Sequence, residues 1–323
     1  MKDQPRERLP SLPKIIFMGT PDFAVSSLRA LVEHGHNVLA VVTQPDRPKG
    51  RGRNLTPSPV KRAATECNIE VLQPEKVSDN KFCDLIRVKA PDVLVVVAFG
   101  QILRKALLEI PHWGVVNIHA SILPKYRGPA PIQWAVLNNE AKTGLTAMRM
   151  EEGLDTGPIL LQEETPISPK ETAGQLHDRL ARMSGAFLLR TLDGVAKNSL
   201  TERPQDHNRA TYAPKIDQKL TLIKWDQDAH VISGLIRAFD PRPGANTSVG
   251  GKQIKLFSPQ VTDEDHQGLT PGRVAGYAEG CLYVETGKGV IKIGELQIPG
   301  RKRIPAADFL RGFPLDKGTL LGT

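Results

Sequence analysis

Short hydrophobic runs alternate with amphipathic segments along the first half of the chain. Residues 14–19 (KIIFMG), 37–43 (NVLAVVT), 92–100 (DVLVVVAFG) and 114–119 (GVVNIH) resemble strands that are buried on both faces of a parallel sheet. Between the first two runs, residues 22–34 repeat hydrophobic positions at helical spacing. Strands that alternate with helices in this way predict an α/β domain with a doubly wound, mostly parallel sheet.

The pattern changes after about residue 206. One amphipathic helix, which ends at Asp240–Pro243, is followed by short β-prone runs that turn residues separate at nearly regular spacing. Such runs are typical of a small β-barrel. We therefore expect a polar tail over residues 1–13, an α/β domain over 14–206, and a linker with a β-barrel over 207–323.

Composition narrows the class of protein. Of the 323 residues, 40% are hydrophobic and 24% are charged, as in a soluble globular protein. The three cysteines are far apart, which argues against a disulfide framework and fits a reducing compartment. No hydrophobic run is long enough to span a bilayer, and residues 1–13 lack the apolar stretch of a secretory signal. We expect a cytoplasmic protein.

Polar side chains occur where a buried strand should end. Asn117 and His119 are two positions apart, so both side chains point to the same face of the strand. Downstream, Gly153 and Gly157 bracket Asp155 in an expected tight turn. A lone histidine at a strand end is commonly structural, and an aspartate between glycines is commonly a turn former.

The three residues together suggest acyl chemistry. An amide N–H stabilises an oxyanion, an imidazole moves a proton, and a carboxylate orients the imidazole. No nucleophile accompanies them, because Ser121 lacks the Gly-x-Ser-x-Gly elbow. The histidines show no zinc-binding spacing, and Gly19 is one glycine where a dinucleotide motif needs three. We therefore expect direct transfer to a bound acceptor, without a metal and without NAD.

The motifs carry a resemblance to a known family. "NIHASILPKYRGPAPIQWAVLN" and "TGLTAMRMEEGLDTGPIL" resemble the folate-dependent formyltransferases. "FMGTPDFAV", "QPDRPKGRGRNLTPSPVK" and "PGRKRIPAADFLRG" are similar to the members that act on methionyl-tRNA. The resemblance extends from Lys14 to Gly312. It implies a Rossmann-like domain with the formyltransferase fold, an OB-like β-barrel, and 10-formyltetrahydrofolate and initiator methionyl-tRNA as substrates.

The resemblance also assigns the site residues. Asn117, His119 and Asp155 match the family's catalytic triple. Pro129 and Pro158 depart from the residues usual in the family at those positions, and neither belongs to the triple. The expected folate-binding residues follow strands at one sheet edge; they are Phe99, Gly100, Gln101, Ile102, Leu103, Ser121, Ile122, Leu123, Pro124, Gly153 and Leu154.

Positive charge is concentrated in the loop 43–61 and in the C-terminal third of the chain, a distribution that suits a polyanion. The formal net charge is +8, and residues 43–61 hold five basic residues and one acidic residue. Charged segments are commonly solvated surface, but these suit a phosphate backbone. The expected tRNA-binding residues are Arg47, Lys49, Arg51 and Arg53 in the first segment, and Arg301, Lys302 and Arg303 in the second. Arg47 is the first choice for a contact with the acceptor end.

Other functions remain open on the sequence alone. A formyltransferase that acts on an amino-sugar nucleotide would share the folate site and the triple. A formyltetrahydrofolate hydrolase or dehydrogenase is disfavoured because the C-terminal third has no recognisable aldehyde-oxidising nucleophile. A non-catalytic RNA-binding protein with a degenerate α/β domain would not need the triple. We expect a monomeric methionyl-tRNA-formylating enzyme that has no membrane partner.

Overall fold

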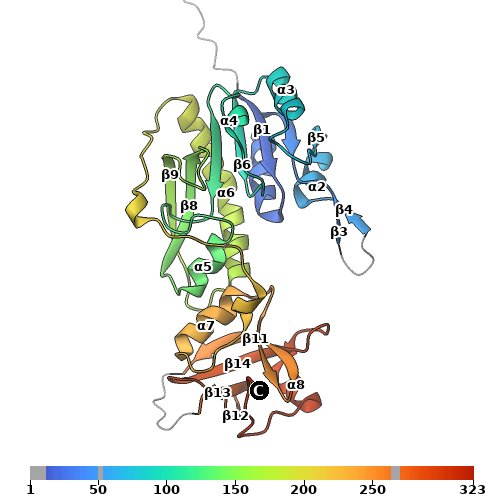
Figure 1. The fold of residues 1–323 in the computed structure, drawn as a ribbon, viewed down its shortest axis with the longest axis vertical. Coiled ribbons are helices and arrows are strands. Elements are labelled where there is room, and N and C mark those ends of the chain that lie inside the picture. Colours follow the sequence, from blue (N-terminus) through green and yellow to red (C-terminus); the bar gives the residue numbers. More distant parts are fainter. Residues whose placement is uncertain (1–11, 50–53, 263–269) are drawn as a thin grey trace, which may run out of the picture. The chain divides into compact units, whose positions relative to one another are not determined.

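The computed structural model describes residues 12–49, 54–262 and 270–323, and it contains two main sheets. The first has seven strands in the order β5-β2-β1-β6-β7-β8-β9 (Figure 1). Pairing from β5 to β7 is parallel, and β8 runs antiparallel to β7. The strands are β1 (Lys14–Gly19), β2 (Asn37–Val42), β5 (Val71–Leu72), β6 (Val93–Val97), β7 (Val115–His119), β8 (Lys142–Arg149) and β9 (Ile159–Pro166).

Helices cover both faces of this sheet. On one face, Ile16 and Met18 of β1 pack into a core cluster with Phe82 and Ile86 of α3 (Asn80–Lys89) and Leu107 of α4 (Lys105–Leu108). α1 (Val25–Glu33) follows a short 3-10 helix, η1 (Asp22–Ala24), and packs on α6 (Ala173–Ala196). The Ser27 and Ser184 hydroxyls of these two helices lie 2.8 Å apart. The predicted α/β class with a mostly parallel sheet is confirmed.

The strand order fixes where a ligand should bind. From β1 the chain proceeds to β2 and β5 on one side, and then crosses to β6 and β7 on the other. In open sheets of this kind, ligands bind at the carboxyl ends of the strands where the order reverses. The crevice is therefore expected beyond Gly19 of β1 and Val97 of β6, next to the end of β7 at His119.

Two short strands lie in the described parts of the basic segment 43–61. β3 (Arg47–Lys49) and β4 (Asn54–Thr56) form an antiparallel hairpin in which Arg47 pairs with Thr56. α2 (Pro59–Glu66) begins within the same segment, because the Ser58 hydroxyl accepts a hydrogen bond from the Lys61 amide at 3.0 Å. The expectation of a loop is corrected on this point. Arg51 and Arg53 lie outside the described residues.

The second sheet is antiparallel, with strands in the order β10-β11-β14-β13-β12 and β15 paired to β14. Hydrophobic side chains alternate along its strands, so Leu282, Val284, Ile291 and Ile293 are completely buried. An antiparallel C-terminal β unit is confirmed. Its elements are η3 (Gln218–Thr221), α7 (Ala229–Ala238), β10 (Ala245–Val249), β11 (Lys252–Val261), β12 (Val274–Ala278), β13 (Cys281–Glu285), β14 (Val290–Gln297), β15 (Ile304–Pro305) and α8 (Ala306–Gly312).

Two compact units share the chain in an interleaved way. The first consists of Met1–Pro129, Gly144–Glu163 and Arg179–Thr211, and the remaining segments form the second. The second unit thus includes α5 (Pro131–Leu137), which packs against α7. The single boundary at residue 206 stays a prediction. None of the described helices has the length and hydrophobicity needed to cross a membrane.

Candidate active site

Asn117 and His119 end β7 with both side chains on one face of the strand. They are 8% and 7% exposed, which leaves a small accessible surface for a substrate atom. The side-chain amide of Asn117 makes no hydrogen bond to any residue in the described part of the chain. Its polar atoms are not among the fully buried atoms without a partner, so the group is accessible and available for a ligand oxygen.

His119 lies between a backbone carbonyl and a carboxylate. Its Nε2 is 2.9 Å from the carbonyl oxygen of Tyr126, and its Nδ1 is 3.8 Å from Oδ2 of Asp155. Because a carbonyl oxygen only accepts, Nε2 carries a proton. A second proton on Nδ1 would face the Asp155 carboxylate. The ring can therefore hold an additional proton with its charge balanced.

The predicted turn brings Asp155 to this point. Asp155 has φ +51°, a left-handed conformation that few residues other than glycine adopt. Its Oδ2 accepts a hydrogen bond from the Gly128 amide at 2.8 Å. Gly157 is required, because a Cβ there would lie 1.8 Å from the carbonyl oxygen of Arg149. The structure thus brings Asp155 to His119.

The segment Ser121–Pro124 is held by buried hydrogen bonds. The hydroxyl of Thr146, on β8, donates to the Ser121 carbonyl at 2.6 Å and accepts from the Leu123 amide at 3.1 Å. Gln162, on β9, donates from Nε2 to the Leu123 carbonyl at 2.8 Å. The Ser121 side chain is completely buried and donates to the Lys125 carbonyl. The backbone of this segment is therefore rigidly positioned, and the Ser121 hydroxyl is not presented as a nucleophile.

The other expected folate residues divide into buried and exposed side chains. Phe99 and Leu103 belong to the core cluster, against which Met150 packs. Ile102 and Leu154, by contrast, are 76% and 54% exposed although both are hydrophobic. Exposed hydrophobic side chains in two of the expected folate segments are available to a partly apolar ligand.

Gln101, a further expected folate residue, has a structural contact. Its Oε1 accepts from the Val77 amide at 3.0 Å, and its Nε2 donates to the Glu75 carbonyl at 3.3 Å. These bonds fix the segment that follows β6 to the loop before α3. A contact of Gln101 with folate stays a prediction.

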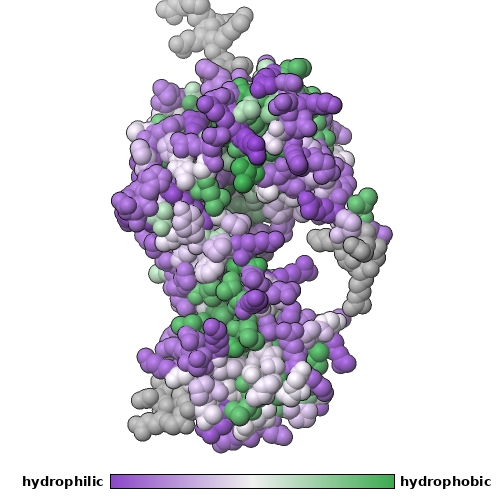
Figure 2. Space-filling view, in the orientation of Figure 1, coloured by the Kyte–Doolittle hydropathy of each residue, from purple (hydrophilic) through white to green (hydrophobic). Residues whose placement is uncertain are grey.

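A cavity of about 480 Å³ lies at the carboxyl ends of β1, β2 and β6. Arg47 of the hairpin and Phe99 both line it, as do Thr20 and Gln44. Figure 2 shows the surface hollowed, with hydrophobic residues inside, near the ends of β1 and β6. The first unit thus brings one expected tRNA-binding residue, Arg47, and two expected folate-binding residues, Phe99 and Gly100, to a single cavity.

The base of the hairpin carries an ion pair next to Arg47. Lys61 Nζ lies 2.6 Å from Oδ2 of Asp46, and Gln73 donates to Oδ1 at 2.8 Å. The hydrogen bonds from Lys61 and Gln73 hold the pKa of Asp46 below its usual value. Asp46 therefore stays ionised, while Arg47 itself is exposed.

The C-terminal basic residues differ in their environment. Arg301 and Lys302 are exposed, whereas Arg303 is partly buried. Arg303 donates to Oδ1 of Asp240 at 2.8 Å and to Glu295, and its guanidinium stacks 4.2 Å from the centre of the Phe257 ring. Burial lowers the pKa of Arg303, but the two carboxylates raise it above its usual value. Arg303 is thus held by contacts within its own unit.

Gly19 confirms the interpretation of a tight strand-to-helix turn. A Cβ there would lie 2.8 Å from Cβ of Ala24 and 3.0 Å from the Val97 carbonyl oxygen. The close packing around position 19 is therefore enough to explain why a glycine stands there. Among the described residues, no group of three His, Cys, Asp or Glu side chains is placed to hold a metal ion.

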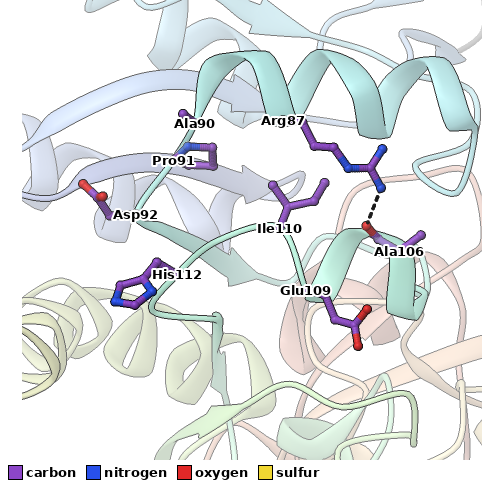
Figure 3. Close-up of a pocket in the computed structure, with 8 residues that line it drawn as sticks. All are labelled: Arg87, Ala90, Pro91, Asp92, Ala106, Glu109, Ile110 and His112. Atoms are coloured by element: carbon purple, nitrogen blue, oxygen red, sulfur yellow. Dashed lines mark hydrogen bonds between the residues drawn. The ribbon is translucent and has the colours of Figure 1, made fainter.

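A larger cavity, of about 580 Å³, opens at the opposite end of the sheet (Figure 3). Arg87 and Asp92 line it, but Arg87 pairs with Asp84 and contacts the Ala106 carbonyl, and Asp92 accepts from the Lys14 amide. It lies at the amino ends of β6 and β7, away from Asn117 and His119. We do not regard it as the active site.

Two residues near the site were not anticipated from the sequence. Arg127 is only 2% exposed, and its guanidinium donates to the side chain of Gln205. Gln205 in turn bonds to the turn that carries Asp155. These contacts join positions about 50 to 80 residues apart. No spacing rule could have found them, because the burial of Arg127 is seen only in the structure.

Comparison with known proteins identifies the family. Residues 13–192 match the model of the formyl transferase family, and residues 215–314 match that of the formyl transferase C-terminal domain. The methionyl-tRNA formyltransferase of Pelotomaculum thermopropionicum is 48% identical over 309 residues, which cover 96% of this chain and 98% of that protein.

Solved structures share the fold at lower identity. A sugar 3N-formyl transferase, WlaRD, crystallised with dTDP and 5-N-formyl-THF, matches with a TM-score of 0.65 at 20% identity, over 90% of this chain and 99% of that chain. HypX from Aquifex aeolicus, in complex with tetrahydrofolic acid, matches with a TM-score of 0.63 at 17% identity. That match covers 97% of this chain, which spans 51% of HypX. By its family models and its identity along nearly the whole length, the chain belongs to the formyl transferase family, among the methionyl-tRNA formyltransferases.

Proposed function

We propose that the protein transfers the formyl group of 10-formyltetrahydrofolate to the α-amine of initiator methionyl-tRNA, giving N-formylmethionyl-tRNA for translation initiation. The observation that carries this proposal is the meeting of Asn117, His119 and Asp155 at the carboxyl edge of the sheet. The near full-length identity to methionyl-tRNA formyltransferases supports the choice of acceptor.

The reaction needs no protein nucleophile. The neutral amine attacks the formyl carbon, a C–N bond forms, and the carbonyl electrons move to oxygen. The oxyanion then collapses, the bond to folate N10 breaks, and the proton lost by the amine reaches N10. An α-amine has a reference pKa of about 7.7–8.0, so a useful fraction is already neutral near physiological pH. The protein must therefore stabilise the oxyanion and move one proton.

Asn117 supplies the oxyanion donor in this proposal. Its amide has no hydrogen-bond partner among the described residues, so a developing oxyanion would be its first strong acceptor. A single donor of this kind is typically worth a factor of about 10²–10³ in rate. His119, on the same face of β7, would add a second donor when its Nε2–H exchanges the Tyr126 carbonyl for the oxyanion.

His119 and Asp155 handle the proton. When the imidazole takes up a proton from the attacking amine, the Asp155 carboxylate 3.8 Å away balances the charge. The same proton then goes to the departing folate nitrogen. Proton transfer by a positioned group contributes about 10²–10⁴ in rate.

The folate would lie against three segments of the first unit. The rigid backbone of Ser121–Pro124 would border the ligand, and the exposed side chains of Ile102 and Leu154 offer hydrophobic surface. Folate-dependent members of the family and the tetrahydrofolate-bound HypX support a folate co-substrate. The detailed contacts are part of the proposal.

The tRNA would use both basic segments. Arg47 lines the cavity at the sheet edge, which suits the acceptor end, and exposed Arg301 and Lys302 suit phosphates elsewhere on the tRNA. We also propose that the protein acts as a monomer in the cytoplasm, where its tRNA substrate is used.

The test compares acceptors directly. The protein is incubated with 10-formyltetrahydrofolate and either charged initiator tRNA or an amino-sugar nucleotide, and formylated product is measured by mass spectrometry. We expect formyl transfer to methionyl-tRNA alone. Transfer to the amino sugar alone would refute the proposed acceptor. If neither acceptor is formylated, the proposed formyltransferase activity is wrong.

A further inference from the structure

One side chain outside the catalytic triple, Gln205, holds the Asp155 turn in place. The side-chain amide of Gln205 donates from Nε2 to the Asp155 carbonyl at 2.9 Å and to the Gly157 carbonyl at 2.7 Å. Gln205 is only 6% exposed, so water does not readily replace these bonds. These two bonds hold Asp155 at φ +51° and also hold Gly157, two residues later.

Arg127 fixes the orientation of that amide. Its Nε and Nη2 donate to Oε1 of Gln205 at 3.1 and 2.7 Å, and its Nη1 and Nη2 lie 3.3 Å from Nδ1 of His207. Because a guanidinium only donates, the Gln205 oxygen must face Arg127 and the NH₂ group must face the turn. None of the described carboxylates lies within ion-pair distance of Arg127. A neutral amide oxygen thus partners a buried cation.

The same region also supports the loop that contacts His119. Thr211 accepts a hydrogen bond from the Tyr126 amide on its hydroxyl and one from the Arg127 amide on its carbonyl, both at 2.9 Å. The Tyr126 carbonyl is the group that contacts His119 Nε2. Gln205 and Thr211 therefore support the partners of His119 on both sides of the ring.

We propose that Gln205 is a positioning residue for formyl transfer: held by Arg127, it keeps the Asp155 carboxylate directed at His119. The inference rests on the proposed function. It accounts for an amide at this position, because only an amide offers both an oxygen to the guanidinium and two N–H groups to the turn. A carboxylate would pair with Arg127 but would repel both carbonyl oxygens of the turn.

The test uses that difference. In Gln205→Glu the oxygens still pair with Arg127, while both N–H donors are lost. We expect the single-turnover rate, at saturating folate and methionyl-tRNA, to fall about 10- to 100-fold, because misplacement of a reacting group by about 1 Å has effects of this size. The KM for methionyl-tRNA should stay within about twofold, and the variant should stay folded, with a Tm lowered by the two turn carbonyls left unpaired. Asn208→Ala, an exposed amide three residues away, is the matched control and should behave as wild type.

A second measurement does not depend on activity. Hydrogen exchange of the Gly128 amide reports the bond to Asp155 Oδ2, and it should become faster in Gln205→Glu but not in Asn208→Ala. An unchanged exchange rate would overturn the inference, as would a wild-type turnover in Gln205→Glu. Global unfolding of that variant would also overturn it, because Gln205 would then be structural. An inactive wild-type protein would refute the proposed function separately, and the exchange rate would still decide whether Gln205 holds the turn.

Discussion

Substitution of Asp155 by asparagine isolates the charge of the catalytic carboxylate. Asparagine tolerates φ near +51° better than most residues, so the turn should keep its conformation. The amide oxygen can still accept the hydrogen bond from Gly128. What the variant loses is the negative charge 3.8 Å from His119 Nδ1.

The size of the effect follows from this distance. At an effective dielectric constant of about 20, two unit charges 3.8 Å apart attract each other by about 4 kcal/mol. If this attraction is present only when His119 is protonated during transfer, its loss raises the barrier by a similar amount. A barrier change of about 4 kcal/mol corresponds to a rate loss of about three orders of magnitude.

The assay is single-turnover formyl transfer with saturating methionyl-tRNA and 10-formyltetrahydrofolate. Glu151→Gln, an exposed acidic residue four positions away, removes the same charge without contact to His119 and should stay within about twofold of wild type. A folded Asp155→Asn variant within tenfold of wild type would show that the carboxylate does not balance the imidazolium. The proposed role of Asp155 would then be wrong.

Three further predictions concern other parts of the molecule. Asn117→Ala should lower the single-turnover rate about 10²–10³-fold with little change in Tm, because the amide bonds to no described residue. Thr146→Val should destabilise the protein to urea by about 1–3 kcal/mol for each backbone group left unpaired, whereas Thr146→Ser, which keeps the hydroxyl, should cost less; equal losses would contradict the hydrogen-bond argument. Arg303→Ala should lower Tm, because Asp240 is buried and loses its partner, whereas Ala at Arg301 and Lys302 should flatten the salt dependence of tRNA binding at unchanged Tm.

The centre of the site could be predicted because short-range rules govern it. Alternation along β7 directs Asn117 and His119 to one face, and parallel strands end at one edge of a sheet. Glycines on either side of Asp155 indicated a turn, and the structure places its carboxylate near His119. Each of these inferences depends on neighbouring residues only.

The rest depends on contacts that leave no pattern in the sequence. Gln205 and Thr211 bond to backbone groups far away in the chain, so neither spacing nor composition distinguishes them from linker residues. Arg303 stands in a basic run beside Arg301 and Lys302, but only the structure shows that its charge is used by Asp240 and Glu295. The hairpin in segment 43–61 is equally hidden, because strands of three residues are too short to show alternation.

The position of Thr211 in the chain sets the order in which the site is assembled during translation. Thr211 is the last residue of the first compact unit, and it bonds to the loop beside His119. At roughly 5–20 residues per second, roughly 5–20 s separate the synthesis of His119 from that of Thr211. Strands β1 to β7 emerge from the ribosome before that time. A nascent chain therefore exposes all of its parallel strands several seconds before Thr211 is available to fix the loop beside His119.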